Sequence, residues 1–158
     1  MKLFDGFETI VKDNEPLAKH TWFRIGGPAR YFIEPNTFDD LCAVVKRCRE
    51  NEIPIYVLGG GANLLIADSG VKGAVIRLAG EDFQQMKFEE NALTVGAGAD
   101  MGKVVLRCVR EGRSGLEGLT GVPGTVGGCV RIAQRYTSAN PAAFRWVFFG
   151  ANSSFNRR

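Results

Sequence analysis

Two glycine-rich segments of this sequence can bind an anion through main-chain amides. The first, Leu58-Gly59-Gly60-Gly61-Ala62-Asn63-Leu64-Leu65, places three glycines directly after an apolar run typical of a strand. Without Cβ atoms, the N–H groups of such a turn can converge on an oxyanion, and a ligand can approach the main chain closely. Asn63 can hydrogen-bond a phosphate or fix the turn. The alternative interpretation is a tight turn with positive φ and no ligand.

The second segment, from Gly115 to Gly128, has five glycines at every third position. It is too short for collagen, and its other positions do not fit that repeat. Its second half is typical of a loop entering a short helix, since Pro123 suits a first helical turn. The N–H groups of Gly124, Thr125 and Val126 would then face outward, and a helix start of this kind attracts a pyrophosphate. Alone, this signal is ambiguous as well.

Familiar nucleotide and metal motifs do not fit. The P-loop requires Gly-Lys-Ser/Thr after its glycines, and neither segment has it. The pattern G-x-G-x-x-G fails after Gly59, because position 64 is leucine. There is no C-x-x-C pair and only one histidine, His20. We therefore predict no metal site, and we expect the four cysteines to be buried as small apolar side chains. They are Cys42, Cys48, Cys108 and Cys129.

Length and composition indicate a folded protein. The chain has 158 residues, of which 45% are hydrophobic and 23% charged, so we expect one domain or two small lobes. No apolar run is long enough to cross a membrane, and residues 1–5 lack the core of a signal peptide. The formal net charge is +3, but residues 133–158 hold four arginines and no acid. The rest is close to neutral, so we expect no binding to nucleic acid. Because the sequence shows neither a membrane span nor a signal peptide, we expect a cytoplasmic protein that does not bind membranes.

Local patterns predict alternating strands and helices, and so an α+β fold. We expect strands over 29–34, 55–58 and 74–78, a hairpin of 85–88 with 92–95, and helices over about 37–51 and 101–112. Asn36 or Thr37 would cap the first helix and Asp100 the second. The apolar run 55–58 predicts a strand buried on both faces, as in a parallel sheet. The first helix would bury one apolar face, consisting of Phe38, Leu41, Cys42, Val45 and Cys48. Residues 1–20 are mixed, and Pro16 would interrupt any helix there.

The composition changes at about residue 133. Residues 133–158 contain six of the sixteen aromatic residues and only one glycine. The stretch 144–149 is compatible with a terminal strand, and a membrane or nucleic-acid contact is a weaker alternative. We interpret the change as a tail foreign to the preceding 132 residues, and we hypothesise that the reading frame was lost there.

Four segments stand in an order and spacing that match one known family. They are Asn14-Glu15-Pro16-Leu17, Thr21-Trp22-Phe23-Arg24-Ile25-Gly26-Gly27-Pro28-Ala29, Val57 to Leu65, and Gly115 to Leu119 followed by Gly121 to Gly128. Together they resemble the UDP-N-acetylenolpyruvoylglucosamine reductase family of peptidoglycan synthesis (UDP-N-acetylmuramate dehydrogenase, MurB). Each motif is weak alone, but four in order are specific. The resemblance covers roughly residues 14–132.

The resemblance implies a vanillyl-alcohol-oxidase (PCMH)-type FAD-binding fold with two small α/β lobes, the second incomplete. The implied division is an N-terminal extension at 1–20, lobes at 21–80 and 81–132, and an atypical tail at 133–158. The FAD pyrophosphate would be held by Gly59, Gly60, Gly61, Ala62, Asn63 and Leu64 of the first segment and by Gly121, Val122, Pro123, Gly124, Thr125, Gly127 and Gly128 of the second. Ala62 replaces the serine usual in the family. Arg24, Gly26 and Gly27 would be structural or close to the flavin, and a buried ion pair or backbone brace is the alternative for Arg24.

The family reaction, as the resemblance implies, passes hydride from NADPH through FAD to the enolpyruvyl group of a UDP-sugar, giving UDP-N-acetylmuramate. The family's catalytic Arg, Ser and Glu lie beyond the matching region, so no catalytic residue is assigned. We expect the FAD-binding portion of a reductase, truncated and inactive alone. The alternatives are a flavin-binding module without chemistry of its own, and an unrelated α/β interaction domain in which both glycine segments are turns.

Overall fold

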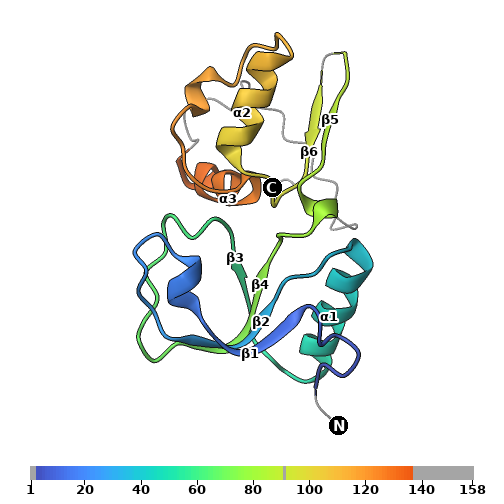
Figure 1. Ribbon diagram of the computed structural model, residues 1–158, viewed down its shortest axis with the longest axis vertical. Helices are drawn as coiled ribbons and strands as arrows, with labels where there is room; N and C mark the ends of the chain where they lie inside the picture. The colour runs from blue at the N-terminus through green and yellow to red at the C-terminus, as the bar shows by residue number, and fades with distance from the viewer. Residues whose placement is uncertain (1–2, 91, 137–158) are drawn as a thin grey trace, which may run out of the picture.

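The first lobe is a mixed four-stranded sheet with one helix on one face (Figure 1). The computed structural model describes residues 3–90 and 92–136. Strands β1 (Val11–Pro16), β2 (Pro28–Ile33), β4 (Val71–Arg77) and β3 (Ile55–Leu58) follow one another across the sheet in that order. β1 is antiparallel to β2, whereas β2, β4 and β3 run parallel. α1 (Phe38–Glu50) connects β2 to β3, and β4 lies between those two strands.

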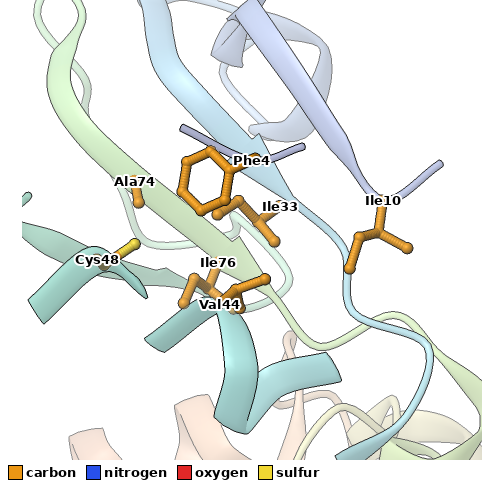
Figure 2. Close-up of a cluster of buried hydrophobic side chains, with 7 residues drawn as sticks. All are labelled: Phe4, Ile10, Ile33, Val44, Cys48, Ala74 and Ile76. Carbon is orange, nitrogen blue, oxygen red and sulfur yellow. The ribbon is translucent and has the colours of Figure 1, made fainter. Parts of the chain in front are cut away.

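Apolar side chains cover both faces of this sheet. The face beneath α1 buries Phe4, Ile10, Ile33, Val44, Cys48, Ala74 and Ile76 (Figure 2). The opposite face buries Leu17, Ala29, Phe32, Leu58 and Val75. Leu17 begins a short 3₁₀ helix, Leu17–His20, that follows β1 and packs on this second face. Because both faces are occupied, the sheet is a rigid support for the loops at its ends.

One sequence expectation about this lobe was wrong, and another is confirmed only in part. β3 is not buried on both faces, because it is an edge strand: Tyr56 is 50% and Val57 72% exposed. The expected apolar face of α1 is partly confirmed, since Cys48 is buried and Leu41 and Val45 pack on the core. The face also includes the buried Val44, whereas Phe38 and Cys42 are exposed. Residues 11–16 form β1 despite their mixed composition, because pairing with β2 supplies what local propensity lacks.

The second lobe is a hairpin packed against two helices. Its strands are β5 (Met86–Phe88) and β6 (Leu93–Val95), and its helices are α2 (Met101–Arg110) and α3 (Val126–Tyr136). Two further 3₁₀ turns span Glu81–Phe83 and Glu117–Leu119. The buried core of this lobe consists of Ala99, Met101, Val104, Cys108, Val126 and Val130. The predicted hairpin and the predicted helix at 101–112 are therefore confirmed, the helix two residues shorter. The strand suggested at 144–149 lies outside the described residues.

Both predicted helix caps are present. The Thr37 hydroxyl accepts from the Asp40 N–H, while the Asp40 carboxylate accepts from the Thr37 N–H, which completes a capping box. Hydrogen bonds to the Asp40 carboxylate, of which the one from the Thr37 N–H has the largest effect, lower the pKa of this carboxyl group. Asp100 caps α2 through a 2.9 Å bond from the Lys103 N–H to its carboxylate. Local sequence thus determines where both helices begin.

The cysteines differ in their surroundings. Cys48 and Cys108 are buried and Cys129 is half-buried, and desolvation raises the pKa of all three thiols, so they stay protonated as small apolar groups. Cys42 is exposed, which corrects the expectation that all four are buried. Among residues 3–90 and 92–136, no helix is long and apolar enough to cross a membrane.

The corrected burial pattern predicts opposite outcomes for one substitution at two positions. Val44→Ala should lower the free energy of unfolding by about 2 kcal/mol, because it removes buried methyl groups and leaves a cavity. Val57→Ala should lower it by less than about 1 kcal/mol, since the exposed side chain loses only strand propensity and edge contacts. Urea unfolding of both variants measures the difference. Equal losses would show that β3 is buried after all.

Candidate functional site

The first glycine segment forms the loop that leaves β3 at the carboxyl end of the parallel strands. Leu58, the last residue of β3, is buried, and Gly59 to Asn63 follow it. Within the described residues, none of the N–H groups of 59–63 donates to a protein acceptor. The loop is anchored at Gly61, whose carbonyl accepts a 3.1 Å bond from the Trp22 N–H. The anchored turn therefore leaves consecutive amides available to a ligand.

Gly61 shows why this turn requires glycine. Its φ is +67°, in the left-handed region, and a Cβ there would lie 2.0 Å from the His20 carbonyl oxygen. A side chain would therefore both strain the backbone and push the loop away from the segment at 20–22.

The second glycine segment forms the loop that enters α3. The turn has positive φ at Gly121 (+82°) and Gly124 (+118°), and it is joined to the start of α2. The Met101 N–H donates to the Gly124 carbonyl and the Val126 N–H to the Ala99 carbonyl, both at 2.9 Å. These two bonds form an isolated β-bridge that fixes the loop against the second lobe.

Two details of the predicted helix start were wrong. α3 begins at Val126, so Pro123 lies in the loop before it rather than in its first turn. The Val126 N–H does not face outward, because it is used by the bridge. The Gly127 N–H donates to the Ala97 carbonyl at 2.9 Å. In the part of the chain that the structure describes, the N–H groups of Gly121, Gly124 and Thr125 have no protein acceptor.

The two loops touch each other, although about sixty residues separate them. A Cβ on Gly60 would lie 2.9 Å from the Gly124 Cα, and a Cβ on Gly59 would lie 2.8 Å from the Thr125 hydroxyl oxygen. That hydroxyl also accepts from the Gly128 N–H at 3.3 Å. In Figure 1 the chain leaving β3 turns toward α3, at the junction of the two lobes. We call this pair of loops, residues 59–63 and 121–125, the glycine junction.

The residues predicted to bind the FAD pyrophosphate differ in solvent exposure. Gly59, Ala62, Gly124, Thr125, Gly127 and Gly128 are half-buried, Gly61 is buried, and Gly60, Asn63, Leu64, Gly121, Val122 and Pro123 are exposed. The close contacts between the two loops described above involve Gly59 and Gly60 of the first loop and Gly124 and Thr125 of the second. Gly127 packs on Ala97. All these residues thus lie on or beside the glycine junction, with the amides at its centre supplied by four of them.

Gly26 and Gly27 pack closely against the chain that follows the first loop, at Ile66 and Asp68. A Cβ on Gly27 would lie 2.0 Å from the Asp68 carbonyl oxygen, and one on Gly26 would lie 2.7 Å from the Ile66 Cβ. Both glycines therefore let residues 21–27 run against the chain that leaves the first loop. Arg24 is exposed, with φ at +54°, and forms no ion pair among the described residues, so the alternative of a buried ion pair was wrong.

Large apolar side chains are exposed on the same two segments. Trp22 is 66%, Phe23 61% and Leu65 75% exposed. The hydrogen bond from Trp22 to Gly61 holds the two segments together, so these side chains belong to one part of the surface. Exposed apolar groups of this size are typical of a surface that a ligand or another chain covers.

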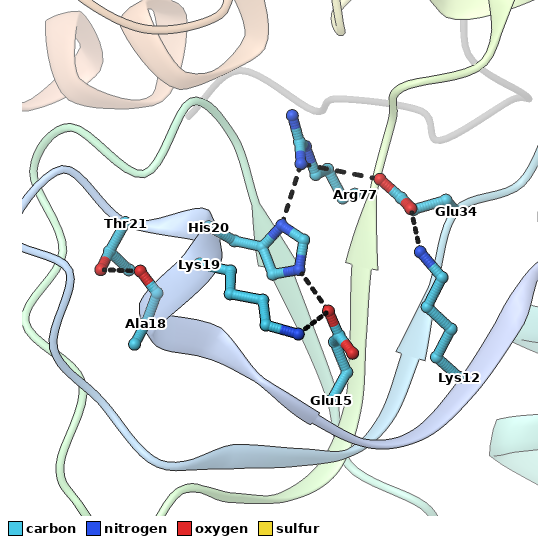
Figure 3. Close-up of polar contacts among 8 residues, drawn as sticks. All are labelled: Lys12, Glu15, Ala18, Lys19, His20, Thr21, Glu34 and Arg77. Carbon is cyan, nitrogen blue, oxygen red and sulfur yellow. Dashed lines mark hydrogen bonds and ion pairs between the residues drawn. The ribbon is translucent and has the colours of Figure 1, made fainter.

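A charged cluster that the sequence analysis missed lies on the sheet beside the junction (Figure 3). The Arg77 guanidinium donates to His20 Nδ1 at 3.1 Å and lies 3.6 Å from Glu34. Since a guanidinium can only donate, His20 Nδ1 is the acceptor, and Nε2–H donates to Glu15 at 3.1 Å. The His20 ring stacks on Phe32 with centroids 4.2 Å apart. The one available signal was an arginine at the end of an apolar strand.

Two surface depressions lie elsewhere. One is lined by Asn14, Pro28, Arg30, Ser69, Val71 and Lys72, the other by Met86, Lys103, Leu106, Arg107 and Arg110. Neither includes a residue of the glycine junction. Over residues 3–90 and 92–136, no three His, Cys, Asp or Glu side chains gather as a metal site would require.

Comparison with known proteins gives one consistent answer. A family described as "FAD binding domain" matches residues 29–133. UDP-N-acetylenolpyruvoylglucosamine reductase of Heliobacterium modesticaldum is 40% identical over 134 residues, which are 84% of this chain and 42% of that protein. The enzyme of the same name from Syntrophobacter fumaroxidans is 44% identical over 124 residues, covering 75% of this chain and 36% of the relative. The chain therefore spans about two-fifths of the length of these relatives.

Solved structures agree with this result. The crystal structure of UDP-N-acetylenolpyruvylglucosamine reductase (MurB) from Thermus caldophilus has a TM-score of 0.59 and 41% identity, covering 76% of this chain and 40% of that one. A solvent-stable cholesterol oxidase has a TM-score of 0.50 at 15% identity, covering 65% and 20%. That second likeness concerns the fold alone. Together they confirm the predicted α+β fold of the PCMH type.

Alanine substitutions at two glycines with nearly the same φ can distinguish the cost of steric crowding from the cost of a left-handed backbone. Gly61 has φ at +67° and Gly112 at +65°, but a Cβ on Gly112 would meet no atom within 4 Å. Gly112→Ala should therefore lower the free energy of unfolding by about 1 kcal/mol, the cost of the left-handed angle. Gly61→Ala should lower it by about 2–4 kcal/mol, since the loop must also leave the His20 carbonyl. Denaturant unfolding compares them, and equal losses would refute the close packing of the first loop.

Proposed function

Because this chain belongs to the FAD binding domain family, we propose that it binds FAD, with the diphosphate held by main-chain amides at the glycine junction. The observation that carries the proposal is the contact of Gly59 and Gly60 with Gly124 and Thr125. Two loops from different lobes bring unengaged N–H groups to one place, where only side-chain-free backbone fits. Such a concave array of amides is suited to phosphate oxygens.

The junction fits a dinucleotide in two further respects. The N–H groups of 59–63 on one side, and of Gly124 and Thr125 on the other, have no acceptor within the described chain, so a diphosphate would satisfy them. Trp22, Phe23 and Leu65 expose apolar surface on the supporting segments, which suits the flat rings of a dinucleotide. Ala62 cannot donate the hydroxyl hydrogen bond of the serine usual there, so we expect a binding site slightly weaker than the family's.

For the whole protein we propose the activity named in its relatives, the reduction of UDP-N-acetylenolpyruvoylglucosamine in cytoplasmic peptidoglycan synthesis. Bound FAD would supply a hydride carrier between NADPH and the enolpyruvyl group. The residues of this chain would bind and orient the cofactor. We assign no catalytic residue to them, and we propose that turnover needs sequence matching the rest of the relatives' length. The proposed division remains a first lobe at 21–80 and a second at 81–132.

The test is titration of the purified chain with FAD, followed by flavin fluorescence. The wild type should bind FAD, and Gly60→Val should weaken binding at least about tenfold, because a side chain there separates the loops and their amides. Gly118→Ala is the matched control, since a Cβ at Gly118 meets no atom within 4 Å and its φ is ordinary. This control should change the affinity by less than about twofold.

The outcomes separate the alternatives. No FAD binding by the folded wild type would favour an interaction domain in which both segments are turns. Normal binding by Gly60→Val would show that the junction is not the site. In the same preparation, NADPH oxidation that depends on the UDP-sugar substrate is not expected, and observing it would contradict the proposal that turnover needs more of the family's sequence.

A further inference from the structure

The glycine junction lacks a positive charge of its own. Neither residues 59–70 nor residues 114–130 contain a lysine or arginine, while they include Asp68 and Glu117. Main-chain amides contribute only partial charges, whereas a diphosphate carries full negative charges in a partly desolvated place. An arginine adds the attraction between full charges, and two parallel hydrogen bonds, to what the amides supply, so a nearby guanidinium would strengthen binding. Such a cation must come from another element.

Arg77 ends β4 next to the first loop. It pairs in the parallel ladder with Leu58, the residue immediately before Gly59. It lies two residues beyond Val75, so its side chain leaves the sheet on the face that Leu58 and Phe32 occupy, away from α1. His20, its hydrogen-bond partner, is also the residue whose carbonyl packs against Gly61. Two independent contacts thus place Arg77 beside the loop.

The cluster orients Arg77 while leaving part of it available. Both contacts, to His20 and to Glu34, use the same nitrogen, Nη1. Among the described residues, Nη2 and Nε have no partner, and Figure 3 shows one guanidinium nitrogen pointing away from His20 and Glu34. The Arg77 side chain is 40% exposed, so a ligand can reach it.

The surrounding charges favour an anion. Lys12 lies 3.2 Å from Glu34 and Lys19 3.9 Å from Glu15, so each carboxylate of the cluster has a lysine partner. With Arg77, the two lysines give the cluster three cations against two carboxylates. The cluster therefore holds one more positive than negative charge, and Arg77 is its member that pairs in the sheet with Leu58, next to the glycine loop.

We propose that Arg77 supplies the positive charge for the FAD diphosphate, with His20 and Glu34 as the residues that position its guanidinium. This inference rests on the proposed function, because it names the side chain that acts with the amides of the glycine junction. Arg77 donates from Nη2 or Nε to phosphate oxygens, and its Nη1 stays with the cluster. Arg24 is the competing cation, since it is exposed on the supporting segment and unpaired there.

Titration of the full chain with FAD at low and high sodium chloride tests this assignment. Arg77→Gln should weaken FAD binding about tenfold or more at low salt. Lys12→Gln is the matched control, because it also removes one cation paired with Glu34 and should change the affinity by less than about threefold. Arg77→Lys should recover part of the loss. Thermal unfolding of each variant shows that it is folded.

A structural role of Arg77 would not reproduce the salt dependence. The wild type should lose more affinity than Arg77→Gln on raising salt, since the screened charge is absent from the variant. Unchanged FAD affinity in folded Arg77→Gln, or a loss seen in Arg24→Gln instead, would overturn the assignment and leave FAD binding itself intact. Equal losses in Arg77→Gln and Lys12→Gln would also overturn it. No FAD binding by the wild type would overturn both proposals.

Discussion

The close approach of two backbones at the glycine junction is the constraint on which the site depends. Gly60 meets Gly124, and Gly59 meets the Thr125 hydroxyl, at separations that a Cβ atom would not tolerate. Each loop is fixed within its own lobe, the first through Gly61 to residues 20–22 and the second through the bridge to α2. The junction therefore combines two rigid halves, and its amides are oriented before a ligand arrives, which reduces the cost of binding.

The four-stranded sheet supports the first loop of the junction and carries the charged cluster beside it. α1 and the Phe4 cluster cover one face, while the other face carries Leu17 and Phe32 beneath the 3₁₀ helix. On that second face the apolar packing ends at a charged cluster, in which His20 stacks on Phe32 and receives Arg77. The 3₁₀ helix Leu17–His20 thus covers the core with Leu17, supports the first loop with the His20 carbonyl, and orients Arg77 with the His20 ring. A binding site of amides and one arginine needs this apolar support, because an unsupported guanidinium would be screened and disordered.

Local signals were enough to predict much of the fold. Short stretches of sequence were enough to predict the helix caps at Thr37 and Asp100, the hairpin at 86–95 and both glycine loops. The family resemblance supplied the α+β FAD-binding fold. The predictions that were wrong concern features set by contacts between residues far apart in the sequence. β3 looked like a central strand, but β4 takes the inner position, so Val57 is exposed. The charged cluster around Arg77 could not be predicted, because its members come from β1, the 3₁₀ helix, the residue that follows β2, and β4. The use of the Val126 amide by Ala99 is likewise non-local.

The central claim is that amides from both lobes bind one diphosphate, and amide NMR spectra of the isotopically labelled chain during FAD titration test it most directly. The account predicts that the N–H signals of Gly59, Gly60, Gly124 and Thr125 shift together with one dissociation constant. Signals from a single loop, or from neither while FAD binds elsewhere, would contradict it.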